Sequence, residues 1–260
     1  MLEMDLMTET CPMPPEYDPL VKAYRRSKEM PFRVWSEIPH HLEGLGPLEG
    51  LDVLDLACGE GFYTRHIRQA GASRVVGIDI SPGMIKLARE QESAAPLGIR
   101  YEVGSAVSLD ESSPFDVVSA AYLLNCAVDR RALAAMAQQI ALQLKPGGRL
   151  VATIGHMGGQ PHVDYRPYGM QTEIATPLTE GAPYQIRFLL EEDSFTITDF
   201  HHSLPTYQDA LQTVGFEQFE WSSCRVSREG LQKMGAEYWK TWLHFPCIWR
   251  LVAKLKAEGG

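Results

Sequence analysis

The feature that most constrains the fold is a regular alternation of short β-rich runs and helical patterns between residues 51 and 155. Five runs favour strands: LDVLDLA (51–57), SRVVGIDI (73–80), GIRYEVGS (98–105), FDVVSAAYLL (115–124) and RLVATIG (149–155). Three helical patterns lie between them: FYTRHIRQAG (62–71), SPGMIKLAREQESA (81–94) and DRRALAAMAQQIALQL (129–144). Alternation of this kind is typical of βαβ units and a parallel sheet covered by helices on both faces.

Local signals at the element ends agree with this interpretation. Ser81 is a suitable N-cap, with Pro82 at the first helical position, and Gly71 is placed to end the preceding helix. The segment KPGG (145–148) predicts a turn before the fifth strand.

After residue 155 the pattern changes, which indicates an insertion followed by two more strands. Residues 156–183 form a long irregular segment of the kind that is usually functional. The later elements are a predicted hairpin, a helix and two strands: YQIRFLL (184–190) with SFTITDF (194–200), LPTYQDALQTVG (204–215), FEQFEWSSC (216–224) and CIWRLVAKL (247–255). We therefore expect an α/β fold with a Rossmann-like, seven-stranded, mostly parallel sheet.

Composition limits the class of partner. The 260 residues suit one α/β domain with a cap, or at most two small domains, and a formal net charge of −9 argues against a nucleic-acid partner. The basic cluster of Lys22, Arg25, Arg26 and Lys28 reads as a solvated helix face. No run approaches the roughly 18 apolar residues of a membrane span, and residues 1–19 read as a flexible acidic arm, so we expect a cytoplasmic protein without a membrane partner.

The five cysteines do not predict a disulfide framework or a metal site. Their number is odd, and none forms a C-x-x-C pair. Cys58 lies in a glycine turn and is a candidate nucleophile, but the alternative, a small packing residue near a strand end, is favoured. No cluster of histidine, cysteine and acidic residues has metal-ligand spacing, so no metal is expected.

The glycine turn ACGEGFYT (57–64) is a poor phosphate site and a good amino-acid site. The third glycine of a dinucleotide fingerprint is missing, no G-K-[ST] follows, and Glu60 would repel a pyrophosphate. Asp55, at the end of the first strand, can accept hydrogen bonds from an ammonium group, and the amides of Gly59 and Gly61 suit a carboxylate. Asp79 ends the second strand, where an acid binds ribose hydroxyls. An amino acid joined to a ribose nucleoside describes S-adenosylmethionine.

At this point the residues resemble a known family. VLDLACGEGFYT, GIDIS with Met84, and LKPGGRLV are similar, in order and spacing, to segments of the class I S-adenosylmethionine-dependent methyltransferases. The resemblance covers about residues 50–155 strongly. It implies a cofactor-binding set of Asp55, Ala57, Gly59, Gly61, Asp79, Ile80, Met84, Ser105, Ala106 and Tyr122.

Within this set, the resemblance implies that Asp79 holds the ribose diol and that Ile80 and Met84 flank adenine. For Met84, packing in the helix core is an equal alternative. Ser105 stands where the family usually has an aspartate for the adenine amino group, so that contact would be weaker here. Tyr122 would lie where cofactor and acceptor meet.

A narrower resemblance is to toxoflavin synthase-like small-molecule methyltransferases of secondary metabolism. The residues that carry it are EYDPLVKAY (16–24), LACGEGFYTR (56–65), AYLLN (121–125) and HHSLPTY (201–207). It implies an N-terminal arm and helical lid over residues 1–46, and a methyltransferase domain over 47–260 with a cofactor half (50–155) and a substrate-side insertion (about 156–203). Tyr17, Tyr24, Phe32 and Trp35 of the lid would contact substrate or cofactor; amphipathic packing is the alternative and is favoured for Phe32.

Candidate groups for the reaction follow from the same reasoning. One of His201 and His202 is a candidate general base, with a structural histidine as the alternative, and Tyr24 completes the catalytic set. The substrate set is Tyr17, Trp35, Tyr122 and His156, with His162 a weaker candidate.

The aromatic set suits a small heteroaromatic or apolar acceptor, with N-methylation favoured over O- or C-methylation. Two alternatives remain: a non-catalytic scaffold with the same fold, and a nicotinamide oxidoreductase, which the missing glycine opposes. We expect a monomer or a homodimer.

Overall fold

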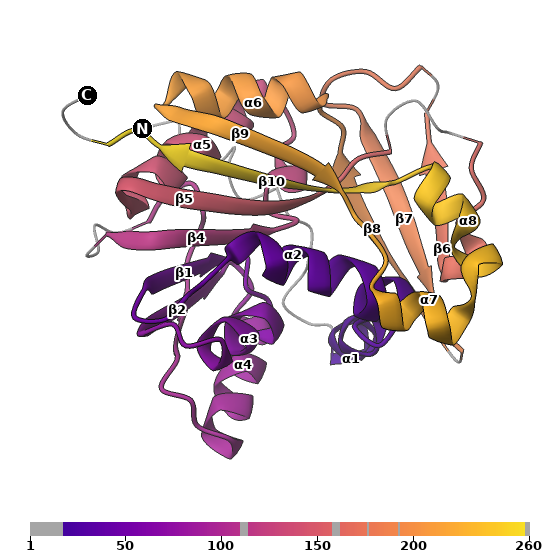
Figure 1. The fold of residues 1–260 in the computed structure, drawn as a ribbon, viewed down its shortest axis with the longest axis horizontal. Helices are drawn as coiled ribbons and strands as arrows, with labels where there is room; N and C mark the ends of the chain where they lie inside the picture. Colours follow the sequence, from indigo (N-terminus) through magenta and orange to yellow (C-terminus); the bar gives the residue numbers. More distant parts are fainter. Residues whose placement is uncertain (1–17, 110–113, 158–161, 176, 192, 258–260) are drawn as a thin grey trace.

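The computed structural model contains a seven-stranded sheet flanked at one end by a three-stranded sheet (Figure 1). It describes residues 18–109, 114–157, 162–175, 177–191 and 193–257. The main sheet has the order β3-β2-β1-β4-β5-β10-β9. Its strands are β1 (Asp52–Leu56), β2 (Arg74–Asp79), β3 (Arg100–Val103), β4 (Phe115–Ala121), β5 (Leu144–Gly155), β9 (Phe216–Ser223) and β10 (Ile248–Leu255).

Strands β1 to β5 are parallel, and β10 is antiparallel to both β5 and β9. This confirms the predicted Rossmann-like, mostly parallel sheet. The strand order reverses between β1 and β4, which is the place where ligands bind in open α/β sheets.

Helices cover both faces of the main sheet, as the alternation predicts (Figure 1). On one face, α5 (Arg130–Gln143) and α6 (Leu204–Thr213) pack over a core that includes Leu54, Val118 and Leu150. On the other face lie α2 (Ile38–Leu45), α3 (Phe62–Gln69) and α4 (Pro82–Ala94). The side chain of Ser81 caps α4 by accepting a hydrogen bond from the amide of Met84, as its position predicts.

The predicted KPGG turn falls within the span of β5, which begins at Leu144 opposite Phe115, and residues 145–148 interrupt the pairing with β4. The irregularity is absorbed within the strand: the register shifts between Phe115 and Val117, and Gly147 has a φ of 77°. Glycine tolerates this conformation, so the strand continues through it.

The second sheet has the order β6-β7-β8 and is antiparallel. The predicted hairpin is β7 (Pro183–Leu189) with β8 (Ser194–Phe200), and β6 (Met170–Ile174) adds an edge strand that sequence reasoning placed in an irregular segment. A cluster of buried aromatic residues joins this sheet to α1 (Asp18–Ser27) and α8 (Ala236–His244). The remaining elements are η1 (Arg33–Glu37), η2 (Leu124–Cys126), η3 (Arg166–Tyr168) and α7 (Arg228–Met234).

None of the helices in the described ranges has the length and apolarity needed to cross a membrane.

Candidate functional site

A cavity lies at the carboxyl ends of β1, β2 and β4, against one strand of the second sheet. Its walls come from the segments after β1, β2, β3 and β4, from Tyr24 of α1, from Met136 of α5 and from β8. The lining residues are Tyr24, Leu56, Ala57, Gly59, Ile78, Asp79, Ile80, Ser81, Met84, Gly104, Ser105, Ala106, Val107, Ala121, Tyr122, Leu123, Cys126, Met136, Thr196, Ile197, Thr198 and Asp199. The cavity therefore coincides with the point where the strand order reverses.

Asp79 is fixed at the cavity wall by two backbone donors. The amide of Gly59 donates to one carboxylate oxygen at 2.8 Å, and the amide of Ser81 donates to the other at 2.8 Å. Burial raises the pKa of Asp79, although both amide hydrogen bonds oppose this shift. Each oxygen has a second lone pair, so the carboxylate can still accept hydrogen bonds from a bound diol.

The glycines of the turn differ in position. Gly59 lines the cavity and has a φ of 57°. Gly61 does not line it; a Cβ there would lie 2.4 Å from the Tyr101 hydroxyl, so only glycine fits beside that ring. Of the three non-glycine residues with positive φ in the described ranges, Ala57 and Tyr122 both line the cavity. Strained backbone of this kind is often concentrated at functional sites.

Asp55 lies beneath the turn rather than in the cavity wall. Its carboxylate accepts hydrogen bonds from Thr64 of α3 at 2.6 Å and from Ser119 of β4 at 2.8 Å. Burial raises the pKa of Asp55 to about 6. In this arrangement Asp55 links α3 to β1 and β4. Cys58 is also buried, and burial raises the pKa of its thiol well above the ordinary value, so the thiol is protonated at neutral pH.

The residues expected around adenine all line the cavity. Ile80 is 44% exposed, whereas Met84 is buried in the helix core and also lines the cavity. Ser105 and Ala106 contribute the neighbouring wall.

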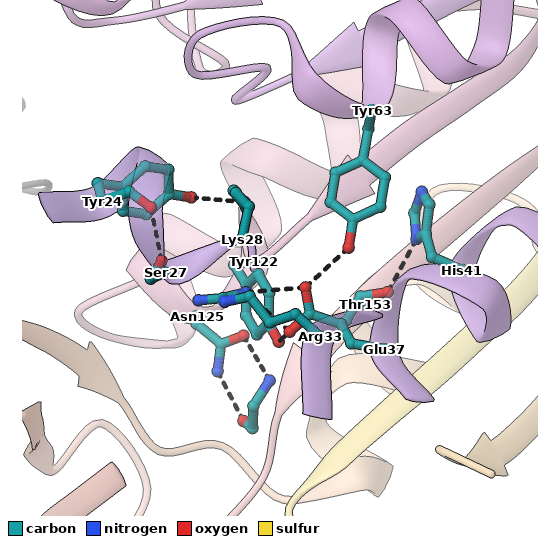
Figure 2. Close-up of polar contacts among 11 residues, drawn as sticks. Tyr24, Ser27, Lys28, Arg33, Glu37, His41, Tyr63, Tyr122, Asn125 and Thr153 are labelled. Atoms are coloured by element: carbon teal, nitrogen blue, oxygen red, sulfur yellow. Dashed lines mark hydrogen bonds and ion pairs between the residues drawn. The ribbon is translucent and has the colours of Figure 1, made fainter. Parts of the chain in front are cut away.

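A buried polar cluster connects the N-terminal helical segment to Tyr122 of the cavity (Figure 2). Arg33 donates to both carboxylate oxygens of Glu37 at 2.8 Å. The hydroxyls of Tyr63 and Tyr122 also donate to Glu37. Burial alone would raise the pKa of Glu37, but the charges of Arg33 and Lys28 and the two hydroxyls lower it.

The sequence did not predict Lys28 as a residue of the site. A smaller pocket that shares Tyr24, Ala57 and Tyr122 with the cavity is lined by Lys28 and Glu60. Lys28 is buried, donates to the Tyr24 hydroxyl at 3.3 Å and lies over the Tyr24 ring, so the prediction of a solvated face is wrong for this residue. Its ammonium group also lies over the rings of Phe62 and Tyr63, and the i,i+4 spacing from Tyr24 could have indicated the contact with that ring.

The predicted histidines lie outside the described lining of the cavity. The ring of His202 is buried, with Nδ1 at 3.1 Å from Glu180 and Nε2 at 2.9 Å from the carbonyl of Ala127. The rings of His201 and His156 stack on each other, and burial lowers the pKa of both, to about 4 for His156.

The aromatic candidates fall into two groups, those that line the cavity and those that pack elsewhere. Tyr24 and Tyr122 line the cavity. Phe32 is buried against Trp242, and Trp35 packs on Gly230 and Lys233, away from the described cavity lining. Tyr17 lies outside the described residues, and His162 is exposed.

Asp199 of β8 is the most informative residue that sequence reasoning missed. It lines the cavity, and its side chain is buried. The Tyr184 hydroxyl approaches it at 3.4 Å, and burial raises the pKa of Asp199 to about 7. Alternation along β8 places it on the same face as Phe195 and Ile197, so an acid at an inward position was the available signal.

The described residues contain no group of three or more histidine, cysteine or acidic side chains that could hold a metal ion.

Comparison with known sequences identifies one region clearly. Residues 53–148 match the family model for a methyltransferase domain. The demethylmenaquinone methyltransferase of Lactococcus lactis is 33% identical over 114 residues, covering 42% of this chain and 44% of that protein. A ubiquinone biosynthesis O-methyltransferase of Xylella fastidiosa is 32% identical over 163 residues, covering 55% of this chain and 65% of that protein. The chain thus spans less than two thirds of the length of these two relatives. The N-demethylindolmycin N-methyltransferase of Streptomyces griseus is 24% identical, covering 64% of this chain and 69% of that protein.

Solved structures share the fold. An S-adenosylmethionine-dependent methyltransferase from Mesorhizobium loti has a TM-score of 0.63 and 20% identity, covering 88% of this chain and 99% of that chain. A second structure, from Listeria monocytogenes, has a TM-score of 0.64 and 18% identity, covering 85% of this chain and 96% of that chain. Together with the sheet order, these findings identify residues 53–148 as a methyltransferase domain and show that the chain has the fold of these S-adenosylmethionine-dependent methyltransferase structures.

Proposed function

We propose that this protein transfers a methyl group from S-adenosylmethionine to a small-molecule acceptor. The observation that carries the proposal is Asp79, which is held by two amides at the end of β2 and lines the cavity where the strand order reverses. The methyltransferase family match over the same region supports it.

The described residues fit the cofactor. Asp79 would accept hydrogen bonds from the ribose diol, and Ile80, Met84, Ser105 and Ala106 would enclose adenine. Gly59 would lie beside the amino-acid end, and Lys28 in the adjoining pocket would pair with its carboxylate. The cofactor supplies an electrophilic methyl group, so the main task left to the protein is to align the acceptor beside Tyr122.

For the acceptor, we propose a small heteroaromatic or apolar molecule methylated at nitrogen. The lining supports this class, because it is mainly apolar with the rings of Tyr24 and Tyr122. The relative that acts on N-demethylindolmycin supports nitrogen, while the ubiquinone biosynthesis O-methyltransferase makes oxygen the second candidate. The net charge of −9 opposes a nucleic-acid acceptor. A monomer or homodimer stays the prediction for the assembly.

The direct test is calorimetric titration with S-adenosylhomocysteine. We expect wild type to bind, and Asp79→Ala to bind about 10- to 150-fold more weakly, since hydrogen bonds to a charged group contribute roughly 1.5–3 kcal/mol. Asp209→Asn, a change of an exposed acid on α6, is the control and should bind like wild type. No binding to wild type at millimolar ligand would overturn the proposal.

A non-catalytic scaffold would bind the cofactor product without turnover. Incubation with methyl-labelled S-adenosylmethionine and a panel of aromatic amines and phenols separates the two functions. Label in any product supports an enzyme, and label in phenols alone would replace nitrogen with oxygen as the acceptor atom.

A further inference from the structure

We infer that Asp199 binds the N–H group of the acceptor and takes its proton, so that the site is built for a primary or secondary amine on an apolar or aromatic body. This inference rests on the proposed function, because it places the acceptor in the same cavity as the cofactor. It also assigns a residue outside the region that the family model matches.

The position of Asp199 is the first argument. Its carboxyl lines the cavity from β8, whereas the residues proposed for the cofactor come from the main sheet and the loops after its strands. Tyr122, at the end of β4, lines the same cavity. A molecule bound between these walls would therefore meet Asp199 on the side away from the nucleoside residues.

The second argument is that Asp199 lacks sufficient partners. The Tyr184 hydroxyl is the one hydrogen-bond partner found for its carboxyl within the described ranges, at 3.4 Å. That hydroxyl also lies 3.2 Å from the carbonyl of Gly155, so its single proton is shared. No ion pair within 4 Å of Asp199 is found among the described residues, and the more distant charge of Arg33 opposes the effect of burial on its pKa without overcoming it. A buried carboxylate without such compensation is costly, and a donor that arrives with the ligand would remove the cost.

Three other acids near the cavity have more donors than Asp199. Glu37 has Arg33 and two tyrosine hydroxyls, Asp55 has two hydroxyls, and Asp79 has two amides. Of the two acids that line the cavity, Asp79 has two amide donors and Asp199 has one long hydroxyl contact, so Asp199 keeps more acceptor capacity for a donor on the ligand.

The chemistry balances with an amine. A protonated amine would bind to the Asp199 carboxylate and transfer one proton to it, which leaves a neutral nitrogen with a free electron pair. In a buried site the neutral pair is favoured over the ion pair. The nitrogen then forms a bond to the methyl carbon while the carbon–sulfur bond breaks and its electrons stay on sulfur. The product is a methylated ammonium ion that leaves with its charge, and the proton held by Asp199 passes to solvent on release, which restores the carboxylate.

The raised pKa of Asp199 supports this role but does not establish it. Because burial raises it to about 7, the group can hold or release a proton near neutral pH.

The experiment uses 2-phenylethylamine and its anionic counterpart 3-phenylpropionate as probes, titrated into the full chain with and without S-adenosylhomocysteine. Wild type should prefer 2-phenylethylamine by about tenfold or more, because the amine donates to the Asp199 carboxyl, whereas the carboxylate of 3-phenylpropionate would place a second acid beside it. Asp199→Asn should reduce that preference to about twofold or less while leaving the affinity for S-adenosylhomocysteine unchanged. Asp193→Asn, an exposed acid on the same hairpin, should behave like wild type.

Tyr184→Phe is the second variant, in case Asp199→Asn does not fold. It removes the hydroxyl partner and keeps the carboxylate, so the ammonium preference should remain. Equal binding of both probes to wild type, or a preference that survives in Asp199→Asn, would overturn the inference. Failure of S-adenosylhomocysteine to bind would instead overturn the proposed function, since the probe preference is also read without it.

Discussion

Two buried carboxyl groups near the cavity have opposite environments. Glu37, in the helical segment before β1, is paired with Arg33 and accepts hydrogen bonds from Tyr63 and Tyr122. Asp199, on the second sheet, has one long hydrogen bond, from Tyr184. The pKa of Glu37 is lowered, whereas that of Asp199 is raised to about 7.

The difference in hydrogen-bond partners indicates different roles for the two carboxyl groups. A fully compensated carboxylate such as Glu37 fixes the position of its neighbours, here Tyr122 at the cavity wall. A buried carboxylate with few hydrogen-bond donors destabilises the protein when it is ionised. A donor on a bound ligand would remove part of that cost. Glu37 therefore has a structural role, whereas Asp199 is the residue that we propose binds the acceptor.

The largest expected effect comes from breaking the Glu37 cluster. Glu37→Gln leaves the buried Arg33 guanidinium without its counter-charge, and loss of one partner of a buried pair costs about 3–5 kcal/mol. Urea unfolding should show this loss of stability. Glu229→Gln, in an exposed pair with Lys233, should change the free energy of unfolding by less than about 1 kcal/mol. A similarly small change in Glu37→Gln would contradict the framework role.

Asp199 should make the protein less stable as pH rises. Its pKa is 3.8 when unperturbed and about 7 in the folded protein, so between these values the folded state holds a proton that the unfolded state has released. The stabilisation is complete below the lower pKa and is lost as pH rises through the upper one. Each pH unit between the two pKa values lowers the free energy of unfolding by about 1.4 kcal/mol, or roughly 4 kcal/mol in total.

Unfolding of wild type and Asp199→Asn at pH 5 and pH 8 checks this expectation. The variant should be more stable than wild type at pH 8, with a smaller advantage or none at pH 5. A stability difference that is independent of pH would show that Asp199 has the same pKa in both states.

The two tyrosines that donate to Glu37 offer a finer comparison. Tyr63→Phe and Tyr122→Phe each remove one hydrogen bond to a charged group, which should cost about 1.5–3 kcal/mol of stability. Only Tyr122 lines the larger cavity in the described structure, so only Tyr122→Phe should also alter methyl transfer. Equal effects of both variants on turnover would place Tyr122 in the framework alone.

The smallest effect is expected at an exposed contact between the same two regions. Arg26 of α1 pairs with Asp193 beside β8 at 3.0 Å, and both side chains are more than 40% exposed. Arg26→Ala should therefore cost less than about 1 kcal/mol, and the cost should disappear in high salt. A larger loss would mean that surface charge, rather than the buried cluster, holds α1 in place.

The comparison also explains how much could be predicted from sequence. The main sheet was predictable because its strands and helices follow local periodicity, and Ser81 and Asp129 mark helix starts through their own side chains. Asp79, Ile80, Met84, Ser105 and Tyr122 follow strand ends, so their meeting in one cavity follows from a parallel sheet.

The second sheet and its acid could not be placed in the same way. The pairing of Glu37 with Tyr122 joins residues 85 positions apart, and Asp199 reaches the cavity only because β8 packs against the carboxyl ends of the main sheet. No local pattern encodes such contacts. Conversely, His202 has a suitable residue type, but its ring is engaged by Glu180 and a backbone carbonyl, which only the fold reveals.

The measurement that tests the account most directly is a crystal structure of the protein with S-adenosylhomocysteine and 2-phenylethylamine. We predict the ribose on Asp79, the adenine beside Met84, and the amine nitrogen on the Asp199 carboxyl, facing the cofactor sulfur next to Tyr122. A nucleoside bound away from Asp79, or an amine bound away from Asp199, would contradict it.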